Sequence, residues 1–179
     1  MMKYVALFLA LASPAVLVRG YEEVQPKTPV GKIVVLDLPP RTALETTSSE
    51  PYFSSSDGMF RRLFRYIQKN DIKMTTPVEV DINPGKMRFF VGSKDTQRKG
   101  VGDQNVDVTN LKARKVLSIG VRGGYTEGNF ITNKKKLLKW LRNNSDYKAA
   151  GKAYAVYWNG PFMPGFLKRS EIHIPIRIK

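Results

Sequence analysis

Two stretches of the chain place apolar and basic residues on opposite faces of a helix. The first apolar arc recurs at helical spacing and is formed by Met59, Phe60, Leu63, Phe64 and Ile67, with Tyr66 at its edge. The second is formed by Phe130, Leu137, Leu138 and Leu141, with Trp140 at its edge. Arginine and lysine fill most of the opposite faces. The pattern predicts two amphipathic helices, the first capped by Ser55, Ser56 or Asp57 and the second ending near Asn143 and Asn144.

Short apolar or alternating runs surround each helix and predict strands. Around the first helix they cover residues 32–38, 41–47, 76–82 and 86–92, and around the second they cover 105–109, 112–121, 153–158 and 170–178. Each half of the chain therefore reads strand-strand-helix-strand-strand.

The two halves also resemble each other in sequence. Residues 61–67 match residues 135–141 in their basic and apolar positions, and residues 37–44 match residues 110–117. The two matches share nearly the same spacing, which favours an internal duplication over chance likeness of two basic helices. We predict an α+β fold in which the two units form one distorted antiparallel β-barrel, with both helices packed outside and a groove between the halves.

The N-terminal segment has the pattern of a signal peptide. Residues 4–18 carry no charge, but they are shorter than the roughly 20 residues that a membrane-spanning helix needs, and they contain Pro14. We expect residues 1–20 to be removed after Gly20, with cleavage after Ala15 or an uncleaved anchor as alternatives. Residues 21–31 are expected to be a flexible lead-in and residues 32–179 a single domain. The expected location is secreted or periplasmic.

The amino-acid composition excludes several kinds of site and suggests an anionic partner. The chain holds 30 Lys and Arg against 15 Asp and Glu, one His and no Cys. Disulfides, thiolate metal sites, thiol nucleophiles and multi-histidine metal sites are therefore excluded. Of the basic residues, 25 lie after residue 57. Nucleic acid, anionic lipid or a carboxylate ligand could each meet this charge, but no nucleic-acid motif accompanies it. We expect no nucleic-acid partner, weak contact with an anionic membrane, and a monomer.

The C-terminal part contains two candidate site features. The loop 159–166 carries Phe162, Met163 and Phe166 between prolines and glycines, and either closes over a flat apolar ligand or packs on its own core. In the last strand, Glu171 and His173 alternate with core-facing isoleucines. They line the groove if their face is inward and are ordinary surface residues if it is outward. No nucleophile elbow is present, so we expect no enzymatic activity.

The segments 59–67, 72–78 and 154–172 together closely resemble the SOUL heme-binding proteins, and the resemblance extends from about residue 32 to 179. It implies a duplicated, distorted barrel with two flanking helices, related to the effector-binding domains of bacterial regulators. It also implies non-covalent binding of heme or another tetrapyrrole in an apolar pocket beside the first helix, with basic side chains near the propionates.

Carried over onto this sequence, the resemblance assigns ligand contacts to a specific set of residues. Met59, Leu63, Tyr66 and Ile67 match the helix positions, Arg62 and Arg65 are candidate propionate partners, and Glu171 matches an acid found in the groove of related domains. Some members are thought to use an axial histidine before the first helix, and residues 51–59 contain none. Either His173, Met59 or Tyr66 ligates the iron, or packing and charge alone hold the ring. Alternatives are an effector-binding module for another small molecule, an enzyme acting on tetrapyrroles through Glu171 and His173, or a polyanion adaptor.

Overall fold

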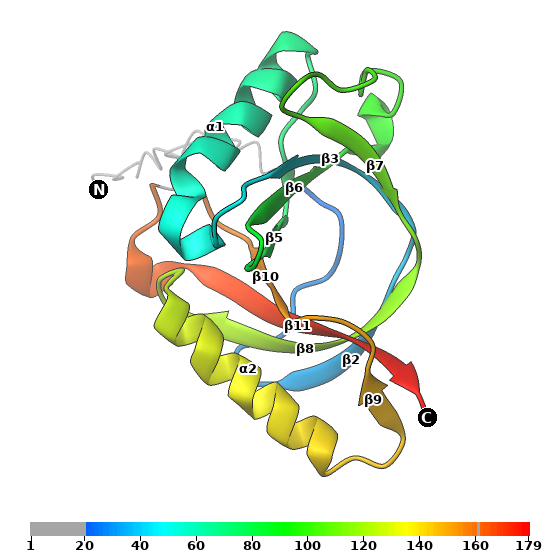
Figure 1. Ribbon diagram of the computed structural model, residues 1–179, viewed down its shortest axis with the longest axis vertical. Helices are drawn as coiled ribbons and strands as arrows, with labels where there is room; N and C mark the ends of the chain where they lie inside the picture. The colour runs from blue at the N-terminus through cyan, green and yellow to red at the C-terminus, as the bar shows by residue number, and fades with distance from the viewer. Residues whose placement is uncertain (1–20, 161) are drawn as a thin grey trace, which may run out of the picture.

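The fold is a curled antiparallel sheet with two helices packed on its outside, as the computed structural model shows for residues 21–160 and 162–179 (Figure 1). The predicted α+β class and the antiparallel, barrel-like architecture are confirmed. The predicted signal peptide, residues 1–20, lies outside the described residues. Within those residues, no helix has the length and apolar character needed to cross a bilayer.

Both predicted units are present in the expected order. The first unit comprises β2 (Ile33–Leu38), β3 (Arg41–Thr47), α1 (Tyr52–Lys69), β5 (Val78–Asp81) and β6 (Lys86–Phe90). The second comprises β7 (Asp107–Leu111), β8 (Arg114–Arg122), α2 (Glu127–Arg142), β10 (Tyr154–Tyr157) and β11 (Arg169–Ile178). The described residues also contain three short strands that the sequence patterns did not predict as separate elements: β1 (Glu22–Glu23), β4 (Thr75–Thr76) and β9 (Tyr147–Ala149).

The order of strands in the sheet reflects the duplication. The path runs β2-β8-β11-β10-β5-β6-β3-β7, with β9 paired to β11, so β10 and β5 meet in the middle. Leu38 lies opposite Arg114, and three residues further on Arg41 lies opposite Leu111. The pairing register therefore continues unbroken across the bend at residues 39–40. The two duplicated segments are thus paired with each other, which curls the sheet round (Figure 1).

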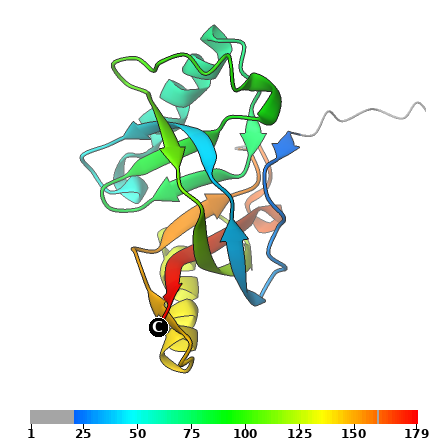
Figure 2. The ribbon, with the colours of Figure 1, turned by 90° about the vertical axis from the view of Figure 1, so that its right-hand side faces the viewer.

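Each helix covers its own part of the sheet. Helix α1 packs against β3 and β6, and α2 packs against β8 and β11 (Figure 2). The buried face of α1 holds Met59, Leu63 and Ile67, as its periodicity predicts. These side chains join a single large core with the sheet residues behind them.

The helix ends differ partly from the predicted ones. Helix α1 begins at Tyr52, so the residues predicted to cap it, 55–57, lie inside the helix. Helix α2 is capped by Thr126, whose hydroxyl accepts a 3.2 Å hydrogen bond from the backbone N–H of Asn129. It ends at Arg142 with Asn143 as its C-cap, as predicted.

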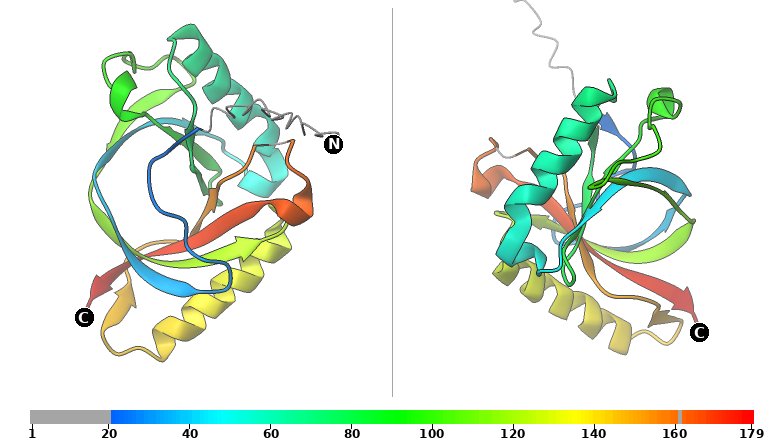
Figure 3. Two further views of the ribbon diagram at one scale, coloured as in Figure 1. Left: turned by 180° about the vertical axis from the view of Figure 1, so that it is seen from behind. Right: turned by 45° about the horizontal axis from the view of Figure 1, so that its top comes forward.

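The segment before β2, which we expected to be unstructured, is ordered and packs along the sheet (Figure 3). Strand β1 pairs in parallel with β4, and Gln25 and Thr28 are buried. The segment passes so close to β8 that a Cβ at Gly120 would lie 2.4 Å from the carbonyl oxygens of Thr28 and Pro29. Glycine at position 120 is what permits this approach.

Candidate functional site

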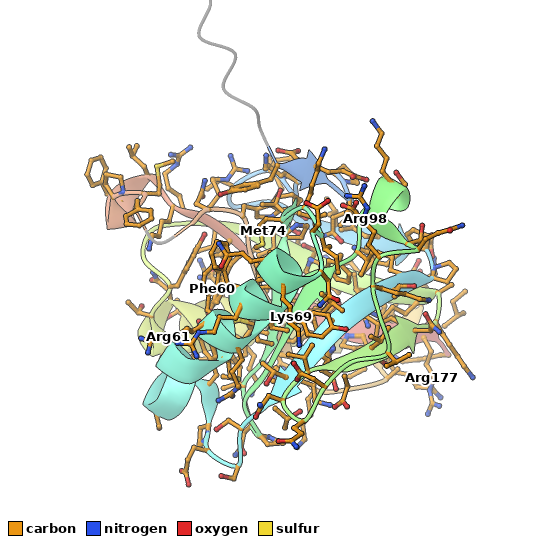
Figure 4. All side chains as sticks on the ribbon, turned by 90° about the horizontal axis from the view of Figure 1, so that it is seen from above. Phe60, Arg61, Lys69, Met74, Arg98 and Arg177 are labelled. Atoms are coloured by element: carbon orange, nitrogen blue, oxygen red, sulfur yellow. The ribbon has the colours of Figure 1, made fainter. Side chains whose placement is uncertain are left out.

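A cavity of about 590 Å³ opens between α1, the sheet and the loop that joins β10 to β11. This volume lies within the range of roughly 300–1,000 Å³ that is typical of small-molecule sites. The cavity is lined by Tyr21, Tyr52, Phe60, Arg61, Phe64, Met74, Thr76, Val78, Met87, Tyr125, Tyr157, Trp158, Asn159, Gly160 and Lys168. Figure 4 shows Phe60, Arg61 and Met74 along the side of α1 where this cavity lies.

Seven of the fifteen described lining residues carry an aromatic ring. The rings of Tyr125 and Tyr157 stack with centroids 4.0 Å apart, and Tyr52 lies 5.9 Å from Tyr157. The rings of Phe60 and Phe64, both in α1, stack with centroids 5.8 Å apart. Rings held against one another offer flat, preorganised apolar surface, which suits a flat ligand.

The charge at the cavity is positive. Arg61 and Lys168 are the charged side chains among the described lining residues, and no acid is among them. Lys168 Nζ lies 4.9 Å from the centre of the Tyr125 ring. Burial raises the pKa of Tyr125 to about 12 and also raises that of Tyr157, so both phenols are neutral at physiological pH. The site therefore combines apolar walls with two cations, which favours an anionic ligand.

The helix residues that the resemblance assigns to the ligand lie in the protein core. Met59 and Leu63 are completely buried, Ile67 is nearly so, and none of them lines the cavity. Tyr66 is also buried, and its hydroxyl donates to the carbonyl oxygen of Lys99 at 2.7 Å. These residues pack in the core on the buried face of α1. The neighbouring face of the helix, which carries Phe60, Arg61 and Phe64, meets the cavity.

The two predicted propionate partners also lie outside the lining. Arg62 donates from Nε to the hydroxyl of Thr46 at 3.0 Å, and Arg65 is exposed on the outer face of α1. The arginine that α1 brings to the cavity is Arg61.

The apolar side chains of the loop 159–166 are exposed. Phe162 is 98% exposed and Phe166 is 74% exposed, while Met163 is 38% exposed. These side chains neither pack on the core nor line the cavity, although Asn159, Gly160 and Lys168 at the two ends of the loop do line it.

Glu171 lies in a dense buried network on the side of the sheet that the N-terminal segment covers. Its Oε1 accepts hydrogen bonds from the backbone N–H of Thr28 and the indole N–H of Trp158, both at 2.8 Å. Its Oε2 accepts from the hydroxyls of Thr28 and Ser118 at 3.0 Å each and from His173 Nε2 at 2.7 Å. Burial raises the pKa of Glu171, but the bonds from His173 and Thr28 outweigh burial and hold this pKa below its ordinary value.

His173 is fully enclosed, and both of its ring nitrogens are engaged within the protein. Nε2 faces Glu171, and Nδ1 lies 3.1 Å from the hydroxyl of Tyr154. The alternation in the last strand left two placements open for Glu171 and His173, lining the groove or lying on the surface. Both side chains are instead buried, and neither lines the cavity. Among the described residues, no group of three His, Cys, Asp or Glu side chains is arranged to hold a metal ion.

A second buried polar cluster is centred on Arg88. Its guanidinium donates to Glu45 at 2.6 Å, Glu79 at 2.9 Å and Asp81 at 2.8 Å, and Arg114 also pairs with Glu79. Burial lowers the pKa of Arg88, but the surrounding carboxylates outweigh it and raise this pKa above its ordinary value. The cluster lines a more polar cavity of about 390 Å³, distinct from the aromatic one. Its charges are largely satisfied within the protein.

Several cavity residues were not identified from the sequence, notably Phe60, Phe64, Arg61 and Tyr125. A signal for the first two was present, because the apolar arc of α1 is wider than one core-facing stripe needs. The excess apolar residues at one edge of the arc are the ones that line the cavity. Tyr125 carried no periodic signal, since it lies in the connection between β8 and α2.

Comparison with known families gives one match that covers most of the chain. The profile of the SOUL heme-binding protein family matches residues 21–175. A comparison with curated protein sequences gives no significant match.

Solved structures share the fold at low sequence identity. The C-terminal domain of EcmrR aligns with a TM-score of 0.65 and 15% identity, over 82% of this chain and 97% of the domain. A structure described as a hydrolase from Listeria innocua aligns with a TM-score of 0.58 and 7% identity, over 84% and 94% of the two chains. SAV2435 bound to tetraphenylphosphonium aligns with a TM-score of 0.51 and 10% identity, over 82% and 94%.

Proposed function

The chain belongs to the SOUL heme-binding protein family, and on this premise we propose that it binds heme or a related tetrapyrrole in the aromatic cavity beside α1. The observation that carries the proposal is the lining itself. Flat aromatic walls suit the macrocycle, and the lining cations Arg61 and Lys168 would pair with its carboxylates.

The residues present fit the ring better than they fit its iron. His173 is the only histidine of the chain, and it is buried behind the sheet with both nitrogens engaged. Met59 and Tyr66, the other candidate ligands, belong to the core. We therefore propose that packing and charge hold the ring, and that a bound heme would supply its colour and redox chemistry without a histidine ligand.

Binding without chemical conversion is part of the same proposal. Glu171 and His173, the pair that an enzyme would use, lie outside the cavity lining. We also propose that the protein is monomeric and that it is exported, either to the periplasm or out of the cell.

A second candidate is a module for lipophilic cations, because one structural neighbour was solved with tetraphenylphosphonium. Aromatic walls can bind a cation through their faces. The absence of any acid among the described lining residues, together with the two lining cations, favours the anionic ring over the cation.

Titration of the purified protein with hemin, with iron-free protoporphyrin IX and with tetraphenylphosphonium tests these proposals. Absorbance of the rings and tryptophan fluorescence, to which the cavity-lining Trp158 contributes, report binding. We expect saturable binding of both rings with affinities that agree within about threefold. If tetraphenylphosphonium binds more tightly than either ring, the second candidate function is favoured. If the ring opens or loses its iron during incubation, the protein is an enzyme that acts on tetrapyrroles. A lack of saturable binding by either ring would refute tetrapyrrole binding.

A further inference from the structure

The loop between β10 and β11 carries a cluster of exposed apolar side chains at one corner of the molecule. We name Phe162, Met163, Phe166 and Leu167 the apolar tip. Their side chains are exposed by 98%, 38%, 74% and 43% respectively. Figure 4 shows the segment around residues 162–167, in faint orange-red, projecting at one corner of the molecule. Single exposed apolar residues are common on proteins, but a contiguous group usually marks an interaction site.

The tip is built on an ordered base. Residues Gly165–Leu167 form a 3-10 turn, and the backbone N–H of Leu167 donates to the carbonyl oxygen of Pro164 at 3.0 Å. Below the turn, the backbone N–H of Arg169 donates to Asn159 Oδ1 at 2.6 Å. Because these hydrogen bonds hold residues 164–169, docking of the tip requires little ordering of that part of the loop.

The surroundings of the tip are basic. Lys168 and Arg169 follow it directly, and Arg122, which is exposed, lies opposite Arg169 in the pairing of β8 with β11. Residues 159–170 contain no acid, and the whole chain carries a formal charge of +15. Apolar side chains with cations at their base match the arrangement of acyl chains below anionic headgroups.

The shape of the tip favours a bilayer over a protein partner. A stable protein interface buries about 800 Å² on each partner, over a broad complementary surface. The tip is a narrow projection of four side chains, which a fluid bilayer can surround without such complementarity. A second copy of the chain is the competing occupant, and the test below distinguishes it.

We propose that the apolar tip inserts into the headgroup region of an anionic bilayer, and that this places the mouth of the aromatic cavity at the membrane surface. The second part rests on the proposed function. The ends of the loop, at Gly160 and Lys168, line the cavity, so tip and cavity mouth are adjacent. A tetrapyrrole partitions into membranes, and docking at this corner would let it pass between bilayer and cavity with little exposure to water.

Sedimentation of the purified protein with ligand-free vesicles tests the insertion. The vesicles contain phosphatidylcholine alone or phosphatidylcholine mixed with phosphatidylglycerol. We expect binding to the mixed vesicles, weakened when salt rises from about 0.1 M to about 1 M, which shortens the Debye length from about 10 Å to about 3 Å. The double variant Phe162→Asp, Phe166→Asp should lower the partition coefficient at least about tenfold.

The matched control is Val101→Asp, because Val101 is also 98% exposed but lies outside the tip. We expect this control to bind vesicles as the unaltered protein does. All three proteins carry the same residues 1–20, so those residues do not account for a difference between them. Hemin affinity, measured without vesicles, should stay within about twofold in both variants. Vesicle binding and hemin binding are read separately, so failure of one proposal is distinguishable from failure of the other.

Four outcomes would overturn the proposal. The first is that the unaltered protein does not bind vesicles, and the second is that Val101→Asp loses as much vesicle binding as the double variant does. The third is that the double variant loses hemin affinity but still binds vesicles. The fourth is that the protein forms an oligomer in vesicle-free solution, that the double variant disrupts this oligomer, and that neither protein binds vesicles. The third would identify the tip as a cover for the cavity, and the fourth would identify it as a contact between copies of the chain.

Discussion

The indole nitrogen of Trp158 donates a 2.8 Å hydrogen bond to Oε1 of Glu171, so a side chain of the cavity wall is fixed by a buried carboxylate. The same carboxylate accepts two hydrogen bonds from Thr28, in the segment that packs along the sheet before β2. Cavity wall, carboxylate and N-terminal segment are therefore one hydrogen-bonded unit. Loss of the carboxylate should weaken all three.

The first prediction is that Glu171→Gln lowers the free energy of unfolding by about 3 kcal/mol at neutral pH. Five donor groups lie within hydrogen-bonding distance of the Glu171 carboxylate, and glutamine would place an amide nitrogen, itself a donor, among them. Urea unfolding monitored by circular dichroism measures the effect. Glu23→Gln, which changes an exposed carboxylate in the N-terminal segment, should cost less than about 1 kcal/mol.

The second prediction concerns pH. The folded-state pKa of Glu171 lies below its ordinary value of 4.5. A lowered pKa contributes stability that is present above the unfolded-state pKa and is lost as the pH falls through the folded-state pKa. Unfolding free energy should therefore fall as the pH drops below about 4.5, and more steeply in the unaltered protein than in Glu171→Gln. Equal slopes in the two proteins, from urea titrations at a series of pH values, would show that this carboxylate does not contribute to acid sensitivity.

The third prediction separates the cavity wall from the core on the same helix. Phe60→Ala removes a ring that lines the cavity, and we expect hemin affinity to fall about tenfold. Leu63→Ala removes a completely buried side chain and should cost about 2–5 kcal/mol of stability, while the folded fraction keeps its affinity. Hemin titration and chemical unfolding of both variants give the comparison. A larger loss of affinity in Leu63→Ala would return the ligand site to the buried face of α1.

The fold could be predicted from the sequence to a large extent. The helical and strand periodicities predict the order of helices and strands in each duplicated unit, because each unit repeats the same succession of apolar and polar patterns. The unbroken register between β2–β3 and β8–β7 connects the segments whose sequences match. Local pattern and global fold agree here, as expected of a sequence with consistent preferences at both levels.

The site could not be predicted in the same way. An apolar residue at a helical position can face either a core or a cavity, and periodicity does not distinguish the two. Likewise, alternation in β11 assigned Glu171 and His173 to one face, but only the packing of residues 24–31 along that face decides that they are buried. That packing depends on contacts between residues more than 140 positions apart.

The fourth prediction concerns the charge at the cavity. Arg61→Glu should lower hemin affinity about tenfold, because it replaces a lining cation with an anion that repels the carboxylates of the ring. Arg65→Glu makes the same change on the exposed face of the same helix and should alter affinity by less than about twofold. Titrations at low salt, where screening is weakest, compare the two. An equal effect of both reversals would point to the overall field of the protein instead of a contact made by Arg61.

The last prediction is that His173 does not ligate the heme iron. Its two ring nitrogens are engaged by Glu171 and Tyr154 inside the protein, and its side chain is fully buried. His173→Gln should therefore leave the absorption spectrum of bound hemin unchanged, while it lowers the unfolding free energy by about 1–3 kcal/mol because buried partners lose a hydrogen bond. Spectra are compared at saturating hemin and at a temperature where both proteins are folded. A shift of the heme absorption bands in the folded variant would show that His173 leaves its buried position to reach the iron. In that case Glu171 would lose its hydrogen bond from His173 when hemin binds. The pH dependence of the unfolding free energy of the protein should then change on hemin binding.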